Sequence, residues 1–263
     1  MTNGTTILRL GNERHMNLDT KTHFENSNLY CPLFNVRRTR SINLIFKNKC
    51  PYTVWPGTLT GSGTPLASTG FTLQPGDSYT MIALPSWSGR IWGRTKCSLN
   101  STTQFFVCET ADCASGQIGC NGAGAIPPAT LLEFTVNGNT NQDFYDISLV
   151  DGYNLPISVS PTTQKCNTTS CPFNINKSCP QELQLKDSTK SDIIACKSAC
   201  LAFQKPQFCC TGAYGTPQTC PPTKYSQFFK ELCPQAYSYA FDDKTSTFTC
   251  PSASTDYLIS FCP

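Results

Sequence analysis

The sequence predicts a mainly β protein, a sandwich or flattened barrel, with a disulfide-rich lobe that contains short helices. Three observations predict this fold. Short runs of alternating apolar residues are separated by Gly and Pro turns, as in antiparallel sheets. The 263 residues include 17 cysteines, more than a reducing compartment sustains, which indicates a disulfide framework and secretion. Hydrophobic residues make up 39% of the chain, which is enough for a core.

Residues 1–40 are expected to form a poorly ordered extension, because they are polar and mixed in charge. They lack the apolar run of a secretory signal, and three explanations stay open: a wrongly assigned first exon, a lost signal or an unusual export route. Cys31 lies upstream of all other cysteines, so we expect it to be unpaired or absent from the mature protein.

The strand pattern begins at residue 41. The stretch "SINLIFKNKCPYTVWPG" (41–57) predicts two antiparallel strands followed by a Pro-Gly turn. Next, "FTLQPGDSYTMIAL" (71–84) predicts a hairpin that turns at Pro75-Gly76. "GRIWGRTKCSL" (89–99) continues the strand pattern.

Further strands are predicted in three later segments: "LLEFTVNG" (131–138), "QDFYDISLVDGYNLPISVSP" (142–161) and "YLISFCP" (257–263).

Between residues 173 and 233 the periodicity becomes helical and the cysteines crowd together. "SDIIACKSACLAF" (191–203) predicts a helix with Ser191 as its N-cap, and "YSQFFKELCP" (225–234) predicts a second short helix. This segment has too few aliphatic residues to close its own core, so disulfides must hold it.

Charge and cysteine spacing argue against several other classes of protein. The formal net charge is only +3 and no basic stripe is present, so no nucleic-acid partner is expected. No stretch reaches the ~18 apolar residues of a membrane helix. Short spacings such as "CETADC" and "CKSAC" could suggest zinc, but the gaps are irregular, and His15 and His23 lie outside the cysteine-rich region. We therefore expect neither a metal nor a cofactor.

Asn-X-Ser/Thr sequons at Asn100, Asn167 and Asn176 are compatible with a secreted glycoprotein.

Several segments, in this order, resemble the plant thaumatin-like proteins of the pathogenesis-related group: "GRIWGRTKC", "CETADCASGQIGC", "PPATLLEFTV", "DFYDISLVDGYNLPISV", "CCTGAYGTPQTC" and "YSQFFKELCPQAYSYAFDD". The resemblance runs from about residue 41 to the C-terminus. It implies a sandwich from about residues 41–95, 125–172 and 234–263, an inserted disulfide loop region at 96–124, a helical lobe at 173–233, and a cleft between sandwich and lobe.

The family has sixteen cysteines in eight disulfides, and sixteen remain here when Cys31 is set aside. By order of occurrence the resemblance implies the pairs Cys50–Cys262, Cys97–Cys108, Cys113–Cys120, Cys166–Cys250, Cys171–Cys233, Cys179–Cys196, Cys200–Cys209 and Cys210–Cys220. Cysteine spacing alone could not select this connectivity.

The resemblance also implies an acidic cleft. Many members of the family line it with one arginine and four acidic residues, and the matching positions here are Arg90, Glu133, Asp146, Asp151 and Asp242, with Asp243 as an alternative to Asp242.

Carboxylates bind sugar hydroxyls directionally, and crowded carboxylates raise one another's pKa. Glu133 with Asp146 or Asp151 is therefore the trial pair for glycoside hydrolysis. Structural roles stay open: Asp151 as a turn residue, Glu133 as an ion-pair partner of Arg90, and Asp242 as a turn cap.

Three functions follow as hypotheses from the resemblance. The first is a secreted defence protein, extracellular, apoplastic or vacuolar, that binds fungal β-1,3-glucan or a related target as a monomer. The second is a weak endo-β-1,3-glucanase. The third is a structural or inhibitory module with an unused cleft, similar to allergens or taste-active relatives. The residues that could stack on sugar rings are Trp55, Trp87, Trp92 and the two tyrosines of "AYSYAF", Tyr237 and Tyr239, although most aromatic residues are expected in the core.

Overall fold

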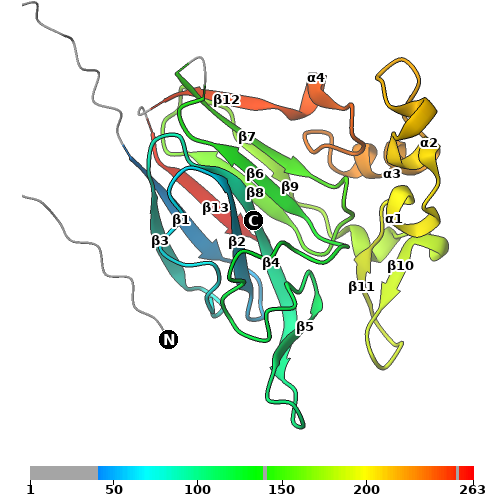
Figure 1. Ribbon diagram of the computed structural model, residues 1–263, viewed down its shortest axis with the longest axis horizontal. Helices are drawn as coiled ribbons and strands as arrows, with labels where there is room; N and C mark the ends of the chain where they lie inside the picture. The colour runs from blue at the N-terminus through cyan, green and yellow to red at the C-terminus, as the bar shows by residue number, and fades with distance from the viewer. Residues whose placement is uncertain (1–40, 139–140, 253–254) are drawn as a thin grey trace, which may run out of the picture. The chain divides into compact units, whose positions relative to one another are not determined.

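The computed structural model describes residues 41–138, 141–252 and 255–263, so the predictions for residues 1–40, including Cys31, lie outside the described residues. Two sheets form most of the protein (Figure 1). The first has the strand order β3 (Ser78–Ala83), β1 (Ile42–Asn48), β13 (Tyr257–Phe261), β8 (Ile157–Pro161), β9 (Thr169–Cys171). The second has the order β12 (Phe248–Pro251), β7 (Gln142–Ser148), β6 (Leu131–Thr135), β4 (Ser88–Leu99), β2 (Trp55–Ser62), and β5 (Phe106–Thr110) pairs with the end of β4. The mainly β prediction is confirmed.

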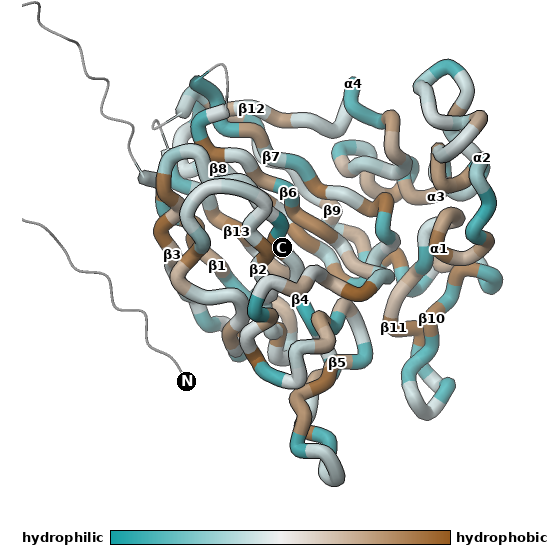
Figure 2. The backbone as a smooth tube through the Cα atoms, viewed as in Figure 1, coloured by the Kyte–Doolittle hydropathy of each residue, from teal (hydrophilic) through white to brown (hydrophobic). Residues whose placement is uncertain are grey.

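Apolar residues from both sheets form the core between them. In β1 every second residue is buried, beginning with Ile42. The ring centroids of Phe134 in the second sheet and Tyr257 in the first lie 4.7 Å apart in an edge-to-face arrangement. Figure 2 shows the same alternation, with brown and teal segments succeeding one another along the strands. The sheets are thus joined by interdigitated side chains, as in other sandwiches.

Two strand pairings differ from the predictions. The segment 41–57 does not form a hairpin: β1 pairs with β13 and β3, whereas β2 pairs with β4 in the other sheet. The segment 71–84 is not a hairpin either, because β3 pairs with β1, and Leu73 makes only an isolated bridge to Val54. Alternation identified the buried face of β1 correctly, but it carries no information about which strand lies next to it.

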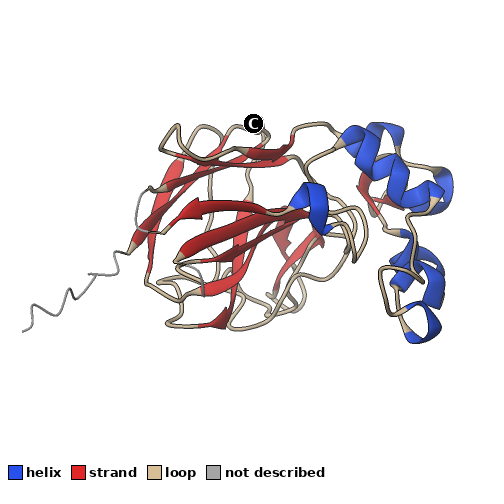
Figure 3. Cartoon of the chain, turned by 90° about the horizontal axis from the view of Figure 1, so that it is seen from above, coloured by secondary structure: helices blue, strands red, loops and turns tan. Residues whose placement is uncertain are grey.

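The lobe contains β10 (Gln184–Lys186), β11 (Ile193–Cys196), α1 (Ala199–Phe203), α2 (Pro206–Cys209) and α3 (Lys224–Leu232), with the 3₁₀ turns η1 (Ile175–Ser178), η2 (Gln181–Leu183) and η3 (Gly212–Tyr214). Figure 3 shows the lobe helices gathered at one end of the strands, whereas the short helix α4 (Asp243–Ser246) lies nearer the sheets. No helix in the described ranges is long and apolar enough to cross a membrane.

The helix prediction is confirmed for α3, which Thr223 begins with a capping box. The prediction of a helix from Ser191 is wrong. Residues 193–196 form β11, paired with β10, and the helix begins only after Ser198, whose side chain accepts a hydrogen bond from the Leu201 N–H. The β-branched pair Ile193-Ile194 favours a strand where a partner strand is available.

The described residues contain eight disulfides, and these are the pairs that the resemblance implies. Cys171–Cys233, Cys179–Cys196, Cys200–Cys209 and Cys210–Cys220 have at least one member in the lobe, where they replace the aliphatic core that its sequence lacks. Cys50–Cys262 links positions 212 residues apart.

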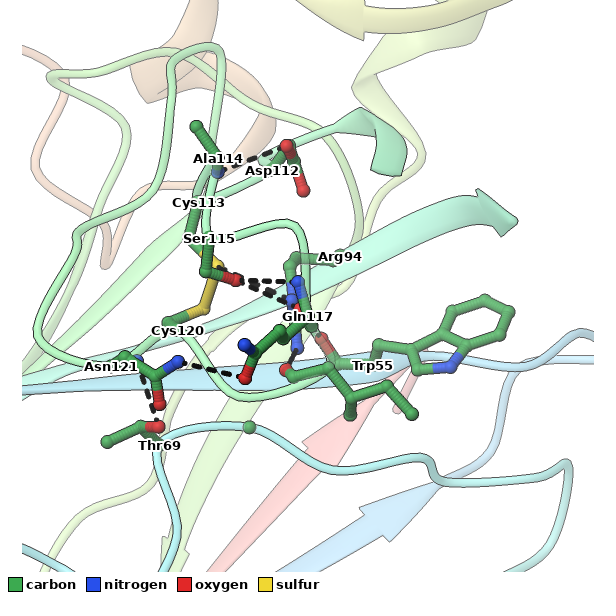
Figure 4. The surroundings of a disulfide bond; sticks show 12 residues. Trp55, Thr69, Arg94, Asp112, Cys113, Ala114, Ser115, Gln117, Cys120 and Asn121 are labelled. Carbon is green, nitrogen blue, oxygen red and sulfur yellow. Dashed lines mark hydrogen bonds between the residues drawn. A yellow bond between two sulfur atoms is a disulfide. The ribbon is translucent and has the colours of Figure 1, made fainter. Parts of the chain in front are cut away.

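A buried arginine holds the loop closed by Cys113–Cys120 against β4 (Figure 4). Arg94 is 0% exposed. Its guanidinium donates to the carbonyls of Trp55, Pro56 and Ile118 and contacts the Cys113 sulfur. Burial lowers the pKa of Arg94 to about 10, although the negative charge of Asp112 opposes this shift. The side chain therefore stays charged at neutral pH and is satisfied by carbonyl dipoles rather than by a carboxylate bridge.

Trp92 lies on the same face of β4 and is also covered, with 0% exposure and its indole N–H bonded to the Ala111 carbonyl. Its neighbour on β2 is Gly57, where an added Cβ would come within 2.5 Å of the indole ring. The close approach of ring and backbone explains the glycine at this position.

Replacing Arg94 by Ala is expected to lower the free energy of unfolding by about 3–5 kcal/mol, because it leaves buried carbonyls without donors and opens a cavity. Arg90→Ala, on the same strand, is the matched control and should cost about 1 kcal/mol or less, because its side chain is 52% exposed. Denaturant unfolding with the disulfides intact measures both. Equal losses would contradict the structural role of Arg94.

The three sequons differ in accessibility. Asn176 Nδ2, the atom that would carry a glycan, donates to the carbonyls of Asn154 (3.1 Å) and Ile194 (3.0 Å). Asn100 and Asn167 are exposed, and neither amide nitrogen donates within the described residues. In protein secreted from a glycosylating host, we expect glycans at Asn100 and Asn167 and none at Asn176. Glycopeptide mass spectrometry provides the check, and occupied Asn176 in folded protein would contradict the expectation.

Candidate functional site

A row of three charged side chains crosses the outer face of the second sheet. Arg90 on β4 lies opposite Glu133 on β6, which lies opposite Asp146 on β7. Side chains directly opposite one another on antiparallel strands have Cβ atoms about 4.5–5.5 Å apart. Ile91, next to Arg90 on β4, and Leu132, next to Glu133 on β6, are buried in the core. Because adjacent residues of a strand point to opposite faces, the charged row points away from the core. We call the hollow around this row, which Leu59 and Phe144 also line, the acidic hollow.

Within the row, Arg90 and Glu133 form an ion pair. Arg90 Nε donates to Glu133 Oε1 at 2.6 Å, and the side chains are 52% and 36% exposed. Exposed pairs of this kind add little stability. The pair instead fixes the orientation of Glu133 and leaves its second oxygen as an acceptor.

Asp146 is the unusual member of the row. Its Oδ1 is buried and has no hydrogen-bond partner among the described residues. Burial raises the pKa of Asp146 to about 8, helped by the negative charges of Glu133 and Asp243 and opposed by Arg90. Asp146 is therefore a neutral acid at acidic pH, a state suited to donating a hydrogen bond or a proton.

Two further residues extend the acidic row. These are Tyr237 and Asp243. The Tyr237 N–H donates to the Ile147 carbonyl of β7, and the Tyr237 hydroxyl donates to Asp243 Oδ1 at 2.8 Å. Burial raises the pKa of Tyr237 to about 12, and the negative charges of Asp243 and Asp146 act in the same direction. Sequence reasoning named Tyr237 only as one of the aromatic residues that could stack on a sugar ring, because its contact with β7 joins segments far apart in the chain.

Of the two adjacent aspartates, Asp243 rather than Asp242 interacts electrostatically with Asp146. The Asp242 carboxylate instead accepts from Lys230 Nζ at 2.9 Å and from the N–H and hydroxyl of Ser238, and its side chain is only 12% exposed. Asp242 therefore ties α3 to the chain that follows it.

Asp151 is not among the residues that line the acidic hollow. It lines a second cavity of about 340 Å³, together with Ser198, Phe208 and Tyr239 among others, whereas the acidic hollow has a volume of about 500 Å³. Of the five cleft residues that the resemblance implies, the structure thus brings Arg90, Glu133 and Asp146 into one hollow and places Asp151 and Asp242 outside it. The pair of neighbouring carboxyl groups is Glu133 and Asp146.

Comparison with known proteins gives consistent results. The profile described as "Thaumatin family" matches residues 48–263. A thaumatin-like protein 1 from Pyrus pyrifolia is 60% identical over 226 residues, which cover 85% of this chain and 91% of the relative. A protein from Prunus avium named glucan endo-1,3-beta-glucosidase is 56% identical over 221 residues, 83% of this chain and 89% of the relative.

Among solved structures, a laminaripentaose-producing β-1,3-glucanase bound to laminaritetraose is similar with a TM-score of 0.55 and 12% sequence identity. The match covers 85% of this chain and 99% of that one. At this identity the likeness concerns the fold alone.

The raised pKa of Asp146 predicts how the free energy of unfolding should change with pH. The folded protein holds this proton up to about pH 8, whereas the ordinary pKa is 3.8, so the folded state binds more protons between these values. Stability contributed by Asp146 must then fall as the pH rises from about 4 to 8. Asp146→Asn cannot ionise, so its stability relative to the native chain should rise over the same range in unfolding measurements.

Glu133→Gln provides a second readout, because removing the neighbouring negative charge should lower the Asp146 midpoint in a carboxyl NMR titration. A difference in stability between native and Asp146→Asn proteins that does not vary from pH 4 to 8 would show that folding does not raise the pKa of Asp146.

Proposed function

The chain belongs to the thaumatin family, and from this premise we propose that it is a secreted, defence-type plant protein that binds β-1,3-glucan, or a related component of the fungal surface, through the acidic hollow. The observation that carries the proposal is the row of Arg90, Glu133 and Asp146 on one open face of the sheet.

The row supplies complementary partners for sugar hydroxyls. Glu133, fixed by Arg90, accepts hydrogen bonds, and neutral Asp146 donates one. Phe144 and Leu59, both partly exposed, add apolar surface beside these groups. A volume of about 500 Å³ is within the usual range of small-molecule sites, about 300–1,000 Å³.

Secretion is supported by the disulfides. Eight bridges persist in an oxidising compartment, such as the apoplast, and would not be maintained in the cytosol. We propose that the protein acts there as a monomer without a cofactor.

A weak endo-β-1,3-glucanase is the second candidate, and one observation favours it. Asp146, an acid whose pKa is raised to about 8, lies directly opposite the Glu133 carboxyl group on the neighbouring strand, so a proton donor and a second carboxyl group are adjacent, as glycoside hydrolysis requires. The relative from Prunus avium carries a glucosidase name. In this mechanism Asp146 would be the acid and Glu133 the nucleophile or the general base. Against efficient turnover, the ion pair with Arg90 lowers the nucleophilicity of Glu133, so binding remains the leading proposal.

Binding predicts that Asp146→Ala, Glu133→Gln and Arg90→Ala each weaken retention on insoluble β-1,3-glucan by roughly five- to tenfold, the effect of losing one hydrogen bond to a charged or neutral partner. Glu231→Gln, an exposed carboxylate on α3, is the control and should bind as the native chain does. Unchanged retention in all three variants would favour a structural or inhibitory module in which the hollow is unused.

Catalysis is tested separately by the release of reducing ends from soluble β-1,3-glucan. We expect none above background from the native protein. If reducing ends appear, Asp146→Asn should reduce their rate by roughly 10²–10⁴-fold while binding largely survives, because the amide keeps the shape but carries no transferable proton. Turnover that survives this substitution would exclude Asp146 as the acid.

A further inference from the structure

A separate pocket of about 620 Å³ lies where the sandwich meets the lobe. Its sandwich side includes Tyr52, Trp55 and Lys96, and its lobe side includes Asn174 and Lys177. None of its residues lines the acidic hollow. We call it the aromatic pocket.

Of the three tryptophans in the chain, the one that lines the aromatic pocket is the one that is not fully buried. The chain has three tryptophans, of which Trp87 and Trp92 are 0% exposed with their indole N–H groups bonded to Thr60 and Ala111. Trp55 is partly exposed, and its indole N–H makes no hydrogen bond to any described residue. Tyr52 is 44% exposed. An accessible indole with a free donor offers both a stacking face and a polar contact.

Contacts within the protein join the two sides of the pocket. Asn176 lines it, and its amide nitrogen donates to the carbonyls of Asn154, on the sandwich side, and Ile194, on the lobe side. Lys96 reaches Asp187 in the β10–β11 hairpin at 3.4 Å. Both walls are therefore held together by the protein itself, so a ligand would meet a preformed surface.

Charge and polarity indicate the class of ligand. Lys96 is offset by Asp187 at 3.4 Å and Asp192 at 3.9 Å, so the walls carry little net charge. At the rim, the Asn174 and Lys177 side chains are exposed, and neither makes a hydrogen bond or ion pair to the described residues. Aromatic faces combined with amide groups and little net charge suit a neutral molecule that has both C–H faces and hydroxyl groups.

We propose that the aromatic pocket binds a neutral oligosaccharide, with a pyranose ring stacked on Trp55 and its hydroxyls bonded at the rim by Asn174 and Lys177. This site is independent of the acidic hollow and of its proposed function. Together the two sites would give the protein two separate contacts with polysaccharide.

Tryptophan fluorescence provides a selective test on the full chain. Because the other two tryptophans are fully buried, acrylamide quenching reports mainly on Trp55. We expect laminarihexaose, cellohexaose or chitohexaose to lower the quenching constant roughly twofold, as expected when a ligand covers most of the exposed ring. Protection by none of the three, or only by a charged oligogalacturonide, would overturn the proposal.

Variants locate the effect. Trp55→Ala should weaken affinity about tenfold in calorimetry. Because that change also removes packing against Phe106, the exposed rim variants Asn174→Ala and Lys177→Ala are used in parallel and should weaken binding without lowering the melting temperature. Tyr214→Ala, an exposed aromatic residue outside the pocket, is the matched control and should bind normally.

Asp146→Asn separates the two sites. Trp55 protection should be unchanged in this variant even where retention on β-1,3-glucan is lost. Loss of protection in Asp146→Asn, or normal protection in both rim variants, would place the oligosaccharide elsewhere and overturn the proposal. Conversely, the acidic hollow can fail its own retention assay while the aromatic pocket still binds.

Discussion

The burial of Arg94 is the constraint on which the arrangement of the outer sheet face depends. Every second residue of β4 from Arg90 onwards, that is Arg90, Trp92 and Arg94, lies on the same face of the sheet. All three would be exposed if nothing covered this face. The Cys113–Cys120 loop covers Trp92 and Arg94, and the Arg94 guanidinium binds the loop carbonyl of Ile118 from below. The cover ends before Arg90. The open end of the strand, beyond the loop, is where the acidic hollow lies.

The hollow takes its chemical character from partial burial. A fully solvated Asp146 would ionise near its ordinary pKa and add one more acceptor to a repulsive cluster. Because Asp146 is partly buried on β7, with Glu133 and Asp243 nearby, its pKa is raised to about 8, so below that pH the row contains the Arg90–Glu133 ion pair and a neutral acid. This composition reduces the repulsion that would otherwise oppose folding at this face.

The sequence predicted the mainly β class, most strands and α3, because alternation and capping are local signals. It could not predict which strands are neighbours, since β1 pairs with the distant β13 and the pattern within each strand is the same in either case. The disulfide pairs came from the family resemblance rather than from spacing.

Within the site, Arg90, Glu133 and Asp146 were anticipated by the resemblance. The separate environments of Asp242 and Asp243 depend on Lys230 and Tyr237, whose positions only the folded chain shows. Likewise, nothing in the spacing of the tryptophans distinguished Trp55 from Trp87 and Trp92.

The parallel pairing of β1 with β13 affects how the protein can be synthesised. In the first sheet, β13 lies between β1 and β8, yet it is the last strand to leave the ribosome. Until then, β1 with β3 and β8 with β9 are two separate pairs of strands whose edges have unpaired backbone groups. Cys50 likewise has no disulfide partner until Cys262 is synthesised. This sheet therefore cannot fold progressively from the N-terminus during synthesis, as many domains can. The nascent chain must be kept from mispairing its thiols and strand edges until β13 has been synthesised, so its yield depends on chaperones and on enzymes that form and exchange disulfides.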